Sequence, residues 1–107
     1  MKKLFSLILV TICLCLSATV SADTAKGQGV YMNFCASCHA SAIAGAPAVG
    51  DKNAWQNRTG KGTDAVVENA IKGFQGNSGF MPAKGGNSAL TDEEVTSAVM
   101  YMLELSQ

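Results

Sequence analysis

Histidine is almost absent from this 107-residue chain, since His39 is the only one, so a metal site with two imidazole ligands is excluded. The chain also has no excess of positive charge, because its 8 basic and 8 acidic residues cancel. A nucleic-acid-binding domain usually carries a basic face, so we expect no nucleic acid partner. No alternating strand pattern and no internal repeat is visible, and the apolar spacing favours an all-α domain.

Residues 1–22 have the features of a secretory signal peptide. Two lysines at positions 2 and 3 precede an apolar run from Leu4 to Val20, and Val20-Ser21-Ala22 places small residues before Asp23. The run is long for a signal core and short for a membrane-spanning helix, so an uncleaved anchor stays open as an alternative. We predict cleavage before Asp23, export to the periplasm and one mature domain of residues 23–107.

Only two of the four cysteines, Cys35 and Cys38, lie outside that leader. They belong to Cys35-Ala36-Ser37-Cys38-His39, which is the attachment pattern of a c-type haem. Residues three apart share one face of a helical turn, so both sulfurs could reach one edge of a porphyrin, with His39 beneath the iron. A Cys-x-x-Cys redox pair would need a βαβ pattern around it, and a structural zinc site would need a fourth ligand. We therefore predict one covalently attached haem c per chain and no other metal.

Four helices are expected from the apolar periodicity and the capping residues. They run from Ala25 to Cys38, from Asp51 to Arg58, from Thr63 to a stop at Gly73, and from Thr91 through Leu105. Thr63 is expected as an N-cap, and Thr91 with Glu94 fits a capping box. The glycine-rich stretch from Gly73 to Ser88 is expected to be a loop.

The second iron ligand is expected to be Met81. Pro82 favours extended backbone at Met81, and flanking glycines allow the chain to pass close to a flat cofactor. The other methionines, a lysine, water or an open site are the alternatives. A His39/Met81 pair would fill both axial positions and raise the reduction potential, which suits electron transfer rather than catalysis.

Taken together, these motifs resemble the class I c-type cytochromes, in particular the small bacterial cytochrome c-five type. The segments that carry the resemblance are Cys35-Ala36-Ser37-Cys38-His39, Ala44-Gly45-Ala46-Pro47, Gly50-Asp51-Lys52 with Ala54-Trp55, Met81-Pro82-Ala83-Lys84-Gly85-Gly86 and Ala98-Val99-Met100-Tyr101-Met102. The resemblance implies a small class I cytochrome c fold, with about four helices around one haem. In this fold the N- and C-terminal helices cross, with Gly27 and Tyr31 against Tyr101.

The resemblance also implies roles around the haem. Cys35 and Cys38 would form the thioethers, His39 and Met81 would be the axial pair, and the Pro47 carbonyl would accept the imidazole N–H. Trp55 would lie near the haem propionates, with ordinary core packing as the alternative.

The expected function is that of a periplasmic electron carrier, not an enzyme, that moves single electrons between larger redox proteins. Its partners would bind transiently at the haem edge, and it would meet a membrane only through partner complexes or an uncleaved leader. Among the five lysines of the mature domain, Lys84 is expected to be best placed to steer a partner. The alternatives are a haem subunit of an oxidoreductase complex, and a gas sensor or weak peroxidase in which Met81 dissociates.

Overall fold

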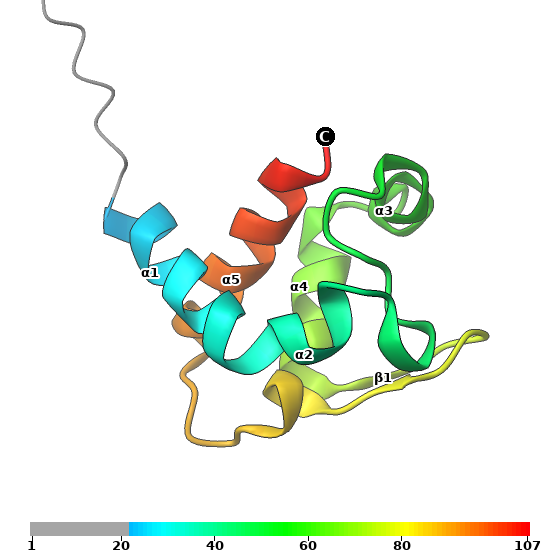
Figure 1. The fold of residues 1–107 in the computed structure, drawn as a ribbon. Coiled ribbons are helices and arrows are strands. Elements are labelled where there is room, and N and C mark those ends of the chain that lie inside the picture. Colours follow the sequence, from blue (N-terminus) through cyan, green and yellow to red (C-terminus); the bar gives the residue numbers. More distant parts are fainter. Residues whose placement is uncertain (1–21) are drawn as a thin grey trace, which may run out of the picture.

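The computed structural model describes residues 22–107, so the predicted signal peptide lies outside the described residues except for Ala22. Its elements, in chain order, are α1 (Ala22–Val30), the π-helical segment η1 (Tyr31–Cys35), α2 (Ala36–His39), the 3-10 turn η2 (Ile43–Gly45), α3 (Lys52–Thr59), α4 (Thr63–Lys72), β1 (Phe74–Gln75), β2 (Phe80–Met81), the 3-10 turn η3 (Ala83–Gly86) and α5 (Asp92–Leu105) (Figure 1). The predicted, mainly helical fold class is confirmed. In this part of the chain, no helix has the length and apolarity needed to cross a membrane.

The N-terminal helical region is interrupted where one continuous helix was predicted. A π-helical segment covers Tyr31–Cys35, and the Ala36 N–H donates to the Tyr31 carbonyl, five residues back. Val30 is buried, and Tyr31 and Cys35 are partly buried against the core, whereas Phe34 and Cys38 are exposed. The prediction of one continuous helix from Ala25 to Cys38 is therefore wrong, because the π-helical segment interrupts it. Single π turns of this kind are frequent at functional sites.

The crossing of α1 and α5 predicted for the N- and C-terminal helices is confirmed (Figure 1). A Cβ added at Gly27 would lie only 2.2 Å from the Ser97 carbonyl oxygen, so only glycine lets the two backbones approach this closely. The ring centroids of Tyr31 and Tyr101 are 5.6 Å apart across the same crossing. The buried core extends from this crossing and consists of Val30, Trp55, Ala70, Leu90, Val95, Ala98, Val99, Met102 and Leu103.

Two of the predicted helix starts have different outcomes. The capping box of α5 is confirmed, because the Glu94 N–H donates to Thr91 Oγ1 at 3.1 Å and the Thr91 N–H donates to Glu94 Oε1 at 3.2 Å. The prediction of Thr63 as an N-cap is wrong. Gly62 takes that position with φ +99°, and its N–H closes the preceding turn onto Thr59, so Thr63 is already helical.

The glycine-rich stretch contains a short antiparallel hairpin, although no strand was predicted. β1 pairs with β2 in the register Phe74 to Met81 and Gln75 to Phe80. Strands of two residues leave no alternating pattern in a sequence, which is why the periodicity did not reveal them. The pairing places Met81 on an ordered strand rather than in a loop.

Candidate haem site

His39 lies at the end of α2 and is 8% exposed. Its Nδ1 is 2.9 Å from the Pro47 carbonyl oxygen, as the resemblance implied. A carbonyl oxygen only accepts hydrogen bonds, so Nδ1 carries the proton and Nε2 keeps a free lone pair. Burial lowers the pKa of His39; the bond to Pro47 opposes that shift and the charge of Arg58 adds to it. The imidazole is therefore held in the neutral form that binds a metal.

The loop that carries Pro47 is fixed by side chains from two helical regions. Trp55 Nε1 donates to the Ala48 carbonyl at 2.8 Å, and the indole ring centroid lies 5.8 Å from that of His39. Ser106 Oγ accepts from the Gly50 N–H at 2.9 Å and donates to a carbonyl within α5. The Trp55 N–H thus donates to the protein backbone, and Trp55 itself is buried in the core. Ser106, a buried residue directly after α5, was missed because nothing in its local sequence marks a contact 56 residues away.

Cys35 and Cys38 lie on opposite sides of the boundary between η1 and α2, and no disulfide joins them. Cys35 is half-buried and Cys38 is exposed. Burial raises the pKa of the Cys35 thiol. Neither sulfur is used in a disulfide, so both are available for the attachment of a haem close to His39 in the chain.

Met81 is half-buried, ends β2 and packs against the core. Pro82, which follows it, is extended with φ −67° and ψ 151°, as was expected of the segment around Met81. A Cβ added at Gly73 would lie 3.2 Å from the Met81 carbonyl oxygen. The backbone of Met81 is therefore held closely against the end of α4.

Close backbone contacts join the segments that carry His39 and Met81. A Cβ at Gly45 would lie 2.0 Å from the Ser78 carbonyl oxygen, so the loop after His39 touches the tip of the hairpin. A Cβ at Gly85 would lie 2.7 Å from the Phe34 carbonyl oxygen, so the turn after Met81 touches the residue before Cys35. The fold thus brings the loop after His39 against the hairpin that leads to Met81, and the turn after Met81 against the segment that leads to Cys35.

The chemistry of this region fits a c-type haem. It offers one free imidazole nitrogen, one thioether and two thiols. Large apolar side chains that remain exposed lie on the same segments, namely Phe34, Ile43, Phe74 and Phe80. Residues 22–107 contain no group of three or more His, Cys, Asp or Glu side chains that could hold a metal ion by themselves. A porphyrin needs few protein ligands and a large apolar surface, and this is what the region provides.

Comparison with known proteins agrees with this chemistry. Residues 22–102 match the family model described as cytochrome C oxidase, cbb3-type, subunit III. The chain is 44% identical over its whole length to cytochrome c-555 of Chlorobaculum tepidum, all of which is covered. It is also 31% identical to cytochrome c5 of Azotobacter vinelandii, over 72% of this chain and 90% of that protein.

The solved structures give the same result. A chain from the crystal structure of an electron transfer complex of nitrite reductase with cytochrome c superposes with a TM-score of 0.67 and 35% identity, over 77% of this chain and 95% of that chain. The resemblance to the cytochrome c-five type is therefore confirmed. The chain belongs to the cytochrome c family, among the small monohaem class I cytochromes that carry a covalently bound haem c.

Proposed function

We propose that this cytochrome is a periplasmic electron carrier in which Cys35 and Cys38 form the thioethers and His39 and Met81 bind the iron. A bound haem supplies an iron centre that exchanges one electron. The observation that carries the proposal is the His39 Nδ1–Pro47 contact, which leaves Nε2 as the free nitrogen of a buried, neutral ring. Its relatives are small electron-transfer cytochromes c, which supports a carrier rather than an enzyme.

The protein residues hold the geometry constant while the charge at the site changes. Pro47 fixes the orientation of the His39 ring, and such outer contacts also tune the basicity of a ligand. The thioether of Met81 is a soft ligand that favours the reduced state and raises the potential. With His39 and Met81 both bound to the iron, no coordination site would remain for a substrate, which would suit electron transfer rather than catalysis.

The partners of the carrier would be a donor and an acceptor that are themselves redox proteins. The structural relative was solved in an electron transfer complex with nitrite reductase, which supports transient partners of that class. We propose no nucleic acid partner, no metal besides the haem iron, and contact with a membrane only through partner complexes or an uncleaved leader.

A haem subunit of an oxidoreductase complex is the second candidate, because the matching family model is described as an oxidase subunit. Gel filtration separates the two, since a carrier elutes alone and a subunit elutes with its complex.

The exported holoprotein provides the direct test through its visible spectrum. The oxidised wild type should show the weak far-red charge-transfer band of methionine on ferric iron, and the reduced form should not bind carbon monoxide. Met81→Ala should lose the band, bind carbon monoxide and have a lower potential. Met100→Ala is the matched control, because Met100 is a half-exposed methionine of α5.

Two results would contradict the proposal. A Met81→Ala protein with an unchanged spectrum and potential would remove Met81 as the ligand. A His39→Ala protein that matures with a normal haem yield would remove His39 as the other ligand.

A further inference from the structure

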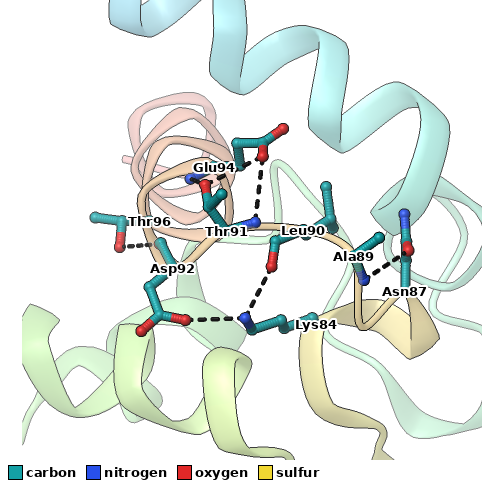
Figure 2. Close-up of polar contacts among 8 residues, drawn as sticks. All are labelled: Lys84, Asn87, Ala89, Leu90, Thr91, Asp92, Glu94 and Thr96. Carbon is teal, nitrogen blue, oxygen red and sulfur yellow. Dashed lines mark hydrogen bonds and ion pairs between the residues drawn. The ribbon is translucent and has the colours of Figure 1, made fainter.

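Lys84 lies three residues after Met81, in η3, and its side chain turns back toward the start of α5 (Figure 2). Its Nζ is 2.8 Å from the Leu90 carbonyl oxygen and 2.9 Å from Asp92 Oδ1. The Lys84 side chain is 21% exposed, whereas that of Asp92 is 69% exposed. The ammonium is therefore occupied by two partners of this chain and is poorly placed to steer another protein, contrary to the role expected from the sequence.

The backbone of Lys84 adopts an unfavourable conformation to make these contacts. Its φ of 55° and ψ of 34° are left-handed, a region that costs energy for any residue with a Cβ. A glycine would adopt this turn without that cost, and Gly85 does so at the next position with φ +63°. A strained residue persists where surrounding contacts determine its conformation. At Lys84 these contacts are the two made by Nζ and a hydrogen bond of 3.1 Å from the Asn87 N–H to the Lys84 carbonyl.

The end of α5 to which Lys84 is bound is itself firmly held. Leu90 is buried in the core, and the capping box closes the first turn of the helix at Thr91 and Glu94 (Figure 2). On its other side, η3 touches the backbone of Phe34 through Gly85. The turn that follows Met81 is thus held between the segment that carries Cys35 and the start of α5.

We propose that Lys84 is a positioning residue for Met81: its ammonium fastens the Met81 segment to the start of α5 and limits how often Met81 leaves the iron. This inference rests on the proposed function, because it takes Met81 as the ligand. An external ligand enters only when Met81 is released, so its apparent affinity rises with the fraction of protein in that released state. Loosening the contact should therefore produce tighter binding of an external ligand.

In the experiment, the ferric holoprotein is titrated with imidazole. Binding is measured as the loss of the far-red band. Lys84→Met removes the ammonium and keeps an apolar side chain, and we expect it to bind imidazole about tenfold more tightly or better, equivalent to at least about 1.4 kcal/mol. Lys84→Arg keeps the charge and several donors, and should restore most of the difference. Lys72→Met is the matched control. It removes the same charge and another ion pair, to Glu68, from an exposed lysine in α4.

The outcomes separate this inference from the proposed function. A wild type without the far-red band would refute Met81 as a ligand, which is a failure of the proposed function. A wild type with the band, and a Lys84→Met protein whose imidazole affinity equals that of the control, would overturn the inference alone. A fall in the unfolding midpoint without a change in imidazole affinity would show a purely structural role and would also overturn it.

A further variant decides the case if Lys84→Met yields no holoprotein. Asp92→Asn removes only the ion pair, and we expect it to tighten imidazole binding about twofold or more. An unchanged affinity in that variant would overturn the inference.

Discussion

Gly27 gives the most direct test of the crossing between α1 and α5. An alanine Cβ at this position would lie 2.2 Å from the Ser97 carbonyl oxygen, 2.7 Å from the Ser97 carbonyl carbon and 3.2 Å from Tyr101 Cβ. Two of these atoms are helix backbone, so no change of rotamer relieves the contact. The helices would have to separate, and the Tyr31–Tyr101 contact would separate with them.

The magnitude depends on two opposing effects. Alanine is more favourable than glycine inside a helix by about 1 kcal/mol. Overpacking a well-packed contact costs about 1–3 kcal/mol, and a backbone contact lies at the upper end of that range. We therefore expect Gly27→Ala to lower the free energy of unfolding by about 1–2 kcal/mol.

Gly29 supplies the matched control on the same helix. It is exposed, and a Cβ there would meet nothing within 4 Å. Only the gain in helix propensity applies, so Gly29→Ala should raise the free energy of unfolding by about 0.5–1 kcal/mol. Guanidinium unfolding of the two oxidised holoproteins, followed by far-UV circular dichroism, measures both. A Gly27→Ala protein as stable as Gly29→Ala would refute the close crossing.

Two further predictions concern polar contacts. Ser106→Ala should lower the free energy of unfolding by about 1–3 kcal/mol, because the Gly50 N–H loses its acceptor; a denaturant titration that shows no loss would contradict the role of Ser106. The pKa of Glu94 is lowered from its usual 4.5, mainly because the Thr91 backbone N–H donates to its carboxylate. A lowered folded-state pKa contributes stability that is complete above the unfolded-state pKa and lost as the pH falls through the folded-state pKa. The free energy of unfolding of Glu94→Gln should therefore fall less steeply below pH 4.5 than that of the wild type. Denaturant titrations at several acidic pH values measure this, and equal slopes for the two proteins would contradict it.

Local rules account for much of what the sequence predicted. The Cys35-to-His39 motif, the four helices and the capping box of α5 each depend on residues a few positions apart. The meeting of Gly27 and Tyr101 came from family resemblance and not from periodicity, because a crossing between distant helices leaves no local pattern.

The features that were missed depend on tertiary contacts. The π-helical segment at Tyr31–Cys35 adds one residue to a turn, and hydrophobic spacing alone does not distinguish it from a continuous helix. The contact between Ser106 and Gly50 joins two segments that are far apart in the chain. Lys84 was interpreted as a surface charge because nothing in its own segment shows that its ammonium reaches Leu90 and Asp92.

The two sides of the haem site are held by different means, and this has a mechanical consequence. The loop after His39 is fixed by the ring contact with Pro47 and by hydrogen bonds from the buried side chains of Trp55 and Ser106. The segment around Met81 has a two-residue strand pair, close backbone contacts and the partly exposed Lys84. Local opening occurs where buried contacts are fewest. If Met81 is the iron ligand, we therefore expect such opening on its side of the site, where the contacts of Lys84 would limit it.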